Sequence, residues 1–297
     1  MKLLVVLLGL LCTSVHGAPN LSEKVHSPHP AYVKDIEILP SDDTRITQGE
    51  RAFRDQFPYQ VSIEWGNNQS PTHLCGGSLI TESVVLTSAS CIRNYGTYII
   101  AAGILNRGEN SSSAQRRNVD SIVVHENWPG EGPAPFDIAL IKVASPFILT
   151  SSVRVVGLPA QGVVPSGSAV LSGWGRTFYN SVLPTVLQHA YLQILPNNEC
   201  ARSLINQLGY SDPLDDTQIC TSARVSDQTK RVSVCRGDSG SPLVQGYVQV
   251  GIVSWGLTPC GTTFAPSVYT RVSTYSDWID DKLEQLRSAV PSGIDNE

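Results

Sequence analysis

A series of short apolar segments, separated by turn residues, sets the strongest limit on how this chain folds. Each segment has the length of a strand, and the spacing between segments is typical of an all-β sandwich or a pair of barrels. The sequence therefore predicts an all-β fold. The segments are 59–65, 77–87, 98–102, 119–125, 138–143, 169–173, 188–194, 241–245, 248–255 and 267–272.

One longer helix is predicted near the C-terminus, at about 275–287. Trp278, Ile279, Leu283 and Leu286 recur there with helical spacing, so they share one face. We expect this face to pack against the last barrel. No repeat at a fixed period is present, which argues against a solenoid or a propeller.

The N-terminal region reads as two processed segments. Lys2, an apolar run and small residues before Ala18 form a secretory signal over 1–17. Residues 18–45 are rich in proline and lack a hydrophobic period, which is typical of a propeptide. No later run reaches the roughly 20 apolar residues of a membrane span. We therefore expect a secreted domain over 46–297 that has no membrane partner.

The composition fits a globular protein, because 41% of the residues are hydrophobic and 16% are charged. The formal net charge is -5, and no basic patch marks a nucleic-acid partner. Of seven cysteines, Cys12 lies in the signal segment and six remain. In an oxidising compartment these suggest three disulfides, although spacing alone leaves the pairing open. Zinc is disfavoured because no Cys-x-x-Cys pair is present.

The most specific motif is the run from Cys235 to Leu243, Cys-Arg-Gly-Asp-Ser-Gly-Ser-Pro-Leu. Small residues flank Ser239 in a tight turn, which exposes the hydroxyl and leaves backbone N–H groups free to bind a developing oxyanion. By itself this pattern also fits an ordinary glycine-rich surface turn.

The whole of 46–286 resembles the chymotrypsin-like serine protease family, because further motifs follow in the family's order. The resemblance implies two packed six-stranded antiparallel barrels, at about 46–157 and 158–274, followed by the C-terminal helix. It implies that Ser239 is the nucleophile, that Asp137 is the acid that orients the family's histidine, and that the N–H groups of Gly237 and Ser239 form the oxyanion hole. The supporting runs are 136–140, 172–175, 254–256 and 266–269.

The same resemblance implies the pairing of the six cysteines. The expected bridges are Cys75–Cys91, Cys200–Cys220 and Cys235–Cys260. No cysteine lies in 18–45, so we expect a cleaved propeptide to leave the domain.

The chain departs from the family at the histidine loop. The family reads Leu-Thr-Ala-Ala-His-Cys, and residues 86–91 read Leu-Thr-Ser-Ala-Ser-Cys, which places Ser90 at the histidine position. A serine hydroxyl has no pKa near neutrality, so it cannot take the proton of Ser239 or return it to a leaving group. The sequence therefore predicts a domain without useful proteolysis.

The expected domain contains three candidate substitutes for the missing histidine, which are His73, His125 and His189. His125 and His189 occupy positions that lie on outer surfaces in the family. His73 occupies the position of a zymogen latch, in which Ser62 and a histidine hold Asp238 before activation. We interpret His73 as part of this latch.

The run that begins Arg45-Ile46 resembles the family's activation junction. Cleavage after Arg45 by a trypsin-like protease would free the amine of Ile46 to pair with Asp238 and order the substrate groove. The expected partners are this activating protease and a peptide or protein ligand in the groove.

The specificity pocket is expected at Ser233, Ser254, Trp255, Gly256 and Ser267. With Ser233 at its base the pocket lacks an acid, so selection of Lys or Arg is disfavoured and an apolar side chain is expected. The loop 105–118 lacks the spaced acidic residues of a calcium site, so no metal and no cofactor are expected.

Three hypotheses follow from these observations. The first is a secreted serine protease homologue, resembling arthropod members, that binds peptides, inhibitors or other proteases. The second is an active chymotrypsin- or elastase-type endopeptidase with low or unusual activity. The third is a structural or storage protein, which the retained motifs disfavour. Asn68 and Asn110 begin glycosylation motifs that are either used or unused.

Overall fold

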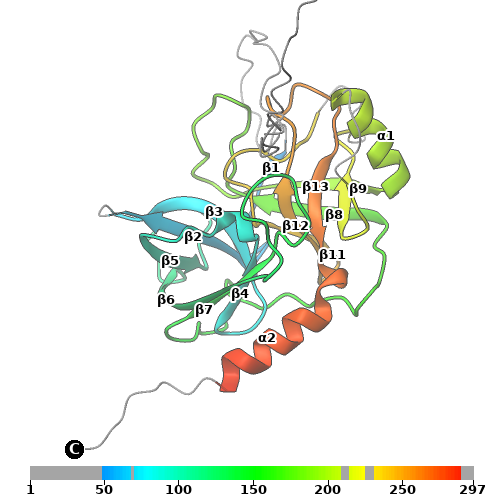
Figure 1. Cartoon of the computed structure of the whole chain (residues 1–297). Helices are drawn as coiled ribbons and strands as arrows, with labels where there is room; N and C mark the ends of the chain where they lie inside the picture. The colour runs from blue at the N-terminus through cyan, green and yellow to red at the C-terminus, as the bar shows by residue number, and fades with distance from the viewer. Residues whose placement is uncertain (1–48, 68–69, 209–213, 225–230, 289–297) are drawn as a thin grey trace, which may run out of the picture.

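A computed structural model describes residues 49–67, 70–208, 214–224 and 231–288. The expected signal, the propeptide, the Arg45–Ile46 junction and Asn68 lie outside these residues. The described part of the chain forms two antiparallel barrels and two α-helices (Figure 1).

The N-terminal barrel is closed in the order β2-β3-β4-β7-β6-β5. Val61, Ile63, Ile100 and Ile141 fill its interior and are fully buried. Their strands alternate inward and outward side chains, so each strand contributes one face to this core. The strands are β2 (Gln60–Gly66), β3 (Thr72–Leu79), β4 (Val84–Thr87), β5 (Thr97–Ala102), β6 (Gln115–Val124) and β7 (Ala139–Val143).

The C-terminal barrel has the order β9-β10-β13-β12-β11-β8, and the pairing of β8 with β9 closes it. Leu171, Leu192, Ile219 and Tyr269 are buried in its core. Two six-stranded barrels confirm the predicted fold class. The strands are β8 (Gly167–Gly173), β9 (Gln188–Leu195), β10 (Gln218–Thr221), β11 (Pro242–Gln245), β12 (Val248–Trp255) and β13 (Ser267–Arg271).

The short strand β1 (Glu50–Arg51) precedes the first barrel but belongs to the second. It pairs with β9, through Glu50 with His189 and Arg51 with Gln188. The sequence boundary at 46–157 placed this segment with the first barrel. The chain therefore begins its described course on one barrel and then crosses to the other.

One expected strand is two strands in the structure. The apolar segment 77–87 is divided by a turn between β3 and β4, in which the Thr81 hydroxyl accepts bonds from the backbone N–H groups of Ser83 and Val84. The polar run Thr81-Glu82-Ser83 marks this turn in the sequence, and the prediction of a single segment passed over it. The strand β10 was also absent from the segments predicted from the sequence.

The helix α1 (Asn197–Leu208) was not predicted from the sequence. Its buried contacts come from Cys200 and Leu204, while Ile205 is exposed. Cys200 and Leu204 lie one turn apart on the same face, and the Cys200–Cys220 disulfide also anchors the helix to β10.

The C-terminal helix α2 (Ser276–Ser288) is present where it was expected. Ile279, Leu283 and Leu286 are buried in a core cluster that includes residues of the N-terminal barrel. Lys142 of β7 also donates a hydrogen bond to the carbonyl of Leu286 at 2.8 Å. The helix thus shares a core with the last barrel, as expected, and also reaches across to the first.

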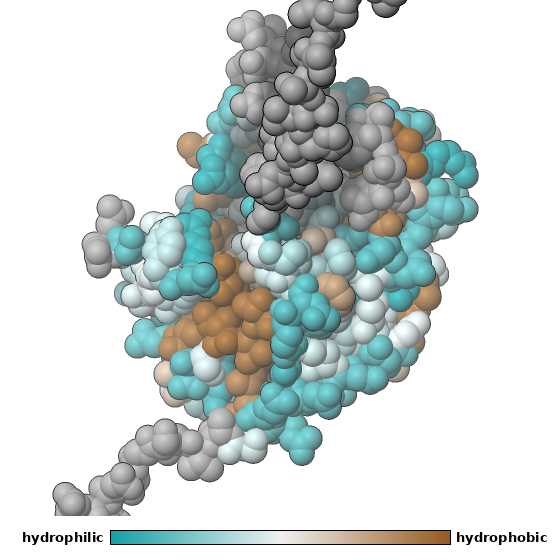
Figure 2. Space-filling view, viewed as in Figure 1, coloured by the Kyte–Doolittle hydropathy of each residue, from teal (hydrophilic) through white to brown (hydrophobic). Residues whose placement is uncertain are grey.

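The surface seen in Figure 2 has hydrophobic residues gathered over β4, β6 and β7, with hydrophilic residues along α2. Among the residues that the structure describes, no helix has the length and apolar content that crossing a membrane requires.

We predict that Ile279→Ala destabilises the domain by about 2–5 kcal/mol, because it leaves a cavity where α2 meets the core. The exposed neighbour Asp280→Ala should change the free energy of unfolding by no more than about 0.5 kcal/mol. Urea unfolding monitored by tryptophan fluorescence measures both. If Ile279→Ala changed the free energy of unfolding as little as Asp280→Ala, α2 would not be part of the core.

Candidate active site

The nucleophile loop lies between Cys235 and β11, and the Cys235–Cys260 disulfide ties it to the segment after β12. Gly240 has a left-handed backbone with φ 77°. A Cβ at this position would lie 2.1 Å from the Thr87 hydroxyl and 2.5 Å from the carbonyl oxygen of Gly76. Only glycine therefore lets the loop approach the N-terminal barrel this closely.

Ser239 lies at the tip of this turn. Its carbonyl accepts a bond from the backbone N–H of Gly76 in β3 at 2.9 Å. Within the described residues, the N–H groups of Gly237 and Ser239 donate to no protein acceptor. These two donors are therefore available to a ligand oxygen, which is the arrangement that an oxyanion hole requires.

Asp137 is 1% exposed and receives its hydrogen bonds from two serines. Its Oδ1 accepts from the backbone N–H of Ser90 at 2.7 Å, and its Oδ2 accepts from the Ser254 hydroxyl at 2.6 Å. Burial raises the pKa of the Asp137 carboxyl, while the hydrogen bonds from Ser254 and Ser90 oppose that shift.

The side chain of Ser90 faces the same carboxylate. Ser90 lies in the short 3₁₀ helix Ala89–Cys91, which the Cys75–Cys91 disulfide joins to β3. Its hydroxyl is 3.1 Å from Oδ2 of Asp137 and 3.1 Å from the Ser88 hydroxyl, so one proton is shared between two acceptors. Among the described residues, no histidine nitrogen bonds to the Asp137 carboxylate.

His73 is buried in β3 and is held at both ring nitrogens. Nε2 is 3.0 Å from the carbonyl oxygen of Gly237, which only accepts, so Nε2 carries the proton. Nδ1 then accepts a bond from the Ser62 hydroxyl at 2.8 Å. Burial lowers the pKa of His73 to about 4, so the ring is neutral near pH 7.

In this structure Ser62 and His73 bond to each other, whereas His73 and Asp238 do not, so the latch before activation stays a prediction. His73 bonds the backbone of Gly237, while the Asp238 carboxylate faces elsewhere and accepts from the N–H groups of Gly175 at 2.8 Å and Cys235 at 3.0 Å. The carboxylate takes this position because two backbone donors satisfy it there.

Asp238 is fully buried, and burial raises its pKa to about 7. A Cβ at Gly175 would lie 2.2 Å from the carboxyl carbon of Asp238, so this glycine makes room for the acid. Sequence reasoning noted 172–175 only as a landmark. The two glycines of Gly-Trp-Gly were the signal that a side chain packs against this backbone.

The other two histidines differ from expectation. His189 is 3% exposed, because Phe57 and Tyr191 pack on its ring and β1 pairs with its strand. His125 is half-buried and stacks on Trp278. Neither is the solvated surface residue that was expected.

Hydrogen bonds and close packing link the segments that carry the expected specificity pocket. The Ser254 hydroxyl donates to Asp137, so this hydroxyl does not line the pocket. Ser267 is 1% exposed and accepts from the N–H of Val234 at 3.0 Å, and Ser233 accepts from the N–H of Gly261 at 2.9 Å. The hydroxyls of Ser233 and Ser267 thus fasten the pocket loops to each other.

The segment at Gly256 packs against the residue that follows Ser233. A Cβ at Gly256 would lie 2.9 Å from the Val234 side chain, so this position is close-packed. The indole N–H of the adjacent Trp255 is buried and has no acceptor among the described residues. The preference of the pocket for an apolar side chain stays a prediction.

Within the described residues, no group of three or more His, Cys, Asp or Glu side chains is arranged to hold a metal ion. The three disulfides present are Cys75–Cys91, Cys200–Cys220 and Cys235–Cys260. They are the pairs that the family resemblance implied.

Comparison with known proteins agrees with this architecture. The family model described as Trypsin matches residues 46–279. Human chymotrypsin-like elastase family member 1 is 32% identical over 260 residues, which cover 85% of this chain and 97% of the relative. Mouse chymotrypsin-C is 35% identical over 259 residues, covering 84% and 93%. Lectizyme of Glossina austeni is 36% identical over 255 residues, covering 81% and 87%. The chain belongs to the trypsin family of chymotrypsin-like serine proteases.

Proposed function

We propose that this protein is a secreted member of the trypsin family that binds peptides, inhibitors or other proteases in its substrate groove without cleaving them. The observation that carries the proposal is the pair of hydrogen bonds from Ser90 to the Asp137 carboxylate. In this proposal Ser90 stands where the family has its general base.

Acyl transfer by Ser239 needs a group that takes its proton and later donates it to the leaving amine. Ser90 has no lone pair of suitable basicity, because a neutral hydroxyl is a very weak base at neutral pH. Removing the histidine from a triad costs about 10⁶-fold in turnover in another serine protease. That loss is about 8 kcal/mol of barrier, which leaves the oxyanion donors and substrate binding as the only sources of rate enhancement.

His73 does not fill the vacant role. Its Nδ1 lone pair accepts from Ser62, and its Nε2 proton is donated to the Gly237 carbonyl. With a pKa of about 4 the ring is also a weak base. Acting on Ser239 would require it to break both bonds and leave its buried position.

The replacement leaves the rest of the site satisfied. Asp137 keeps donors on both carboxylate oxygens, and the N–H groups of Gly237 and Ser239 are free among the described residues. A groove with these properties favours ligand binding without turnover. We infer that cleavage after Arg45 by a trypsin-like protease orders the groove through the Ile46 amine and Asp238.

We predict that the cleaved wild-type chain hydrolyses chymotrypsin and elastase peptide substrates no faster than Ser239→Ala. Ser90→His should raise turnover by several orders of magnitude, since it restores a base between Asp137 and Ser239. Initial rates with chromogenic peptides, measured after cleavage at Arg45, test both statements.

Ser90→Ala is the matched control, because it changes the same position without supplying a base and should stay inactive. Brisk turnover by the wild type would show instead that the protein is an active endopeptidase of the chymotrypsin or elastase type. Labelling of Ser239 by a fluorophosphonate should likewise be weak in the wild type and strong in Ser90→His.

We also predict that cleavage after Arg45 stabilises the domain more at pH 7 than at pH 4. In the uncleaved chain the pKa of Asp238 rises on folding to about 7, so its contribution to stability is complete below about pH 4 and is lost as the pH rises through 7. A new ammonium beside Asp238 would lower that pKa and remove the loss.

The measurement is the difference in melting temperature between cleaved and uncleaved chains at the two pH values. Asp238→Asn should make this difference independent of pH. A difference that is equal at pH 4 and pH 7 in the wild type would contradict the pairing of Ile46 with Asp238.

A further inference from the structure

The loop between β5 and β6 presents alternate residues to solvent. Glu109, Ser111 and Ser113 are half-buried, whereas Asn110 and Ser112 are exposed. The exposed pair forms the motif Asn-Ser-Ser, with no proline at the middle position. The structure therefore separates the residues that hold this loop from the residues that it displays.

The inward residues make the bonds that fix the loop. The Glu109 carboxylate accepts from the backbone N–H groups of Leu105 at 2.9 Å and Asn106 at 3.0 Å, and it pairs with Arg54 at 2.5 Å. The Ser113 hydroxyl donates to the carbonyl of Gly103 at 2.9 Å. Burial acts to raise the pKa of Glu109, but hydrogen bonds from Asn106, Ser111, Leu105 and Arg54 outweigh it and lower the pKa to about 2, so the carboxylate stays charged and bound.

The side chains of the exposed residues Asn110 and Ser112 make none of the bonds that fix the loop. Within the described residues, the side chains of Asn110 and Ser112 make no hydrogen bond and no ion pair. Their amide and hydroxyl groups are thus free to meet an enzyme from outside. The fold gives no other reason for an asparagine and a serine at this spacing.

We propose that Asn110 carries an N-linked oligosaccharide. The donor is a lipid-linked oligosaccharyl diphosphate of the secretory pathway. A bond forms between Asn110 Nδ2 and the anomeric carbon, the bond from that carbon to the phosphate oxygen breaks, the amide loses one proton, and the lipid diphosphate leaves. The proposal rests on the export that the proposed function includes.

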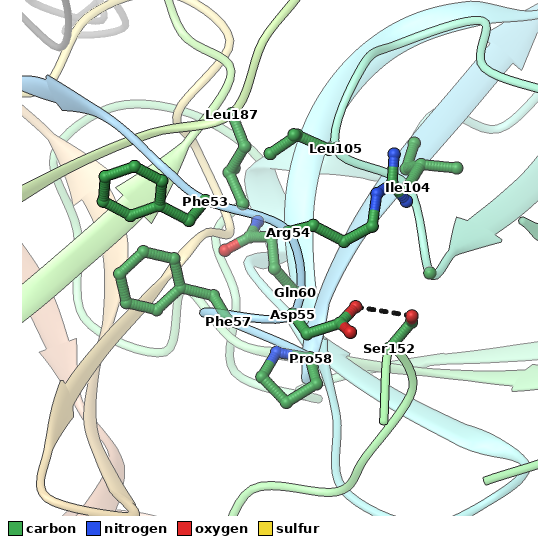
Figure 3. A pocket seen from close by; sticks show the side chains of 11 residues that line it. Phe53, Arg54, Asp55, Phe57, Pro58, Gln60, Ile104, Leu105, Ser152 and Leu187 are labelled. Carbon is green, nitrogen blue, oxygen red and sulfur yellow. Dashed lines mark hydrogen bonds between the residues drawn. The ribbon is translucent and has the colours of Figure 1, made fainter. Parts of the chain in front are cut away.

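One residue that holds the loop of Asn110 also lines a pocket. Arg54, which holds Glu109 and Ser113, also lines a pocket together with Phe53, Asp55 and Ser152 (Figure 3). The polar groups of this pocket are engaged, since the Ser152 hydroxyl donates to Asp55 at 2.5 Å.

The experiment is translation of the full chain with microsomes of the endoplasmic reticulum. The imported chain is treated with peptide N-glycosidase in water enriched in heavy oxygen. We expect the peptide containing residue 110 to carry labelled aspartate. Asn110→Gln and Ser112→Ala should lose the label, whereas Ser112→Thr should keep it, because threonine preserves the motif.

Protease protection and processing before Ala18 are measured in the same reactions. A chain that is imported and processed but unlabelled at residue 110 would overturn the glycan while leaving export intact. A chain that is not imported would overturn both. Enzymatically deglycosylated wild type and Asn110→Gln should melt at the same temperature, because the Asn110 side chain bonds to nothing in the fold.

Discussion

The buried carboxylate of Asp137 is the constraint on which the centre of this molecule depends. Burying a charge is costly unless hydrogen bonds replace its water, and here the bonds come from both barrels. Ser90 belongs to the first barrel, whereas Ser254 of β12 belongs to the second. Thr270 of β13 adds a bond to the Asp137 carbonyl at 2.8 Å. The acid thus joins the barrels whether or not it orients a base.

This dual role explains how a chain with serine at position 90 keeps the rest of the site. A serine offers the carboxylate a backbone N–H at 2.7 Å and a hydroxyl at 3.1 Å, so the electrostatic requirement of folding is met. Proton transfer is a separate requirement, because it depends on the basicity of the side chain at position 90 and on its distance from Ser239. The fold therefore needs a hydrogen-bond donor at position 90, which a residue unable to transfer a proton can supply.

Short apolar segments predicted an all-β fold, and the run around Ser239 carried the family resemblance that implied two barrels. The helix α1 was missed although Cys200 and Leu204 share one face of it. The sequence did not predict the bond of His73 to the Gly237 carbonyl or the bond of Ser254 to Asp137. Those contacts join residues far apart in sequence, and which of two nearby acceptors a donor reaches is decided by packing that no local pattern encodes.

The pairing of β1 with β9 affects the rate at which a new N-terminus would reach Asp238. Glu50 and Arg51 pair with β9 of the second barrel. A new N-terminus at Ile46 would therefore be connected to this barrel by only a few residues. A tether that short raises the local concentration of the amine near its acceptor to the order of millimolar or more. The search of the new terminus for Asp238 would then be an intramolecular step, independent of protein concentration and resistant to competition from free amines in solution.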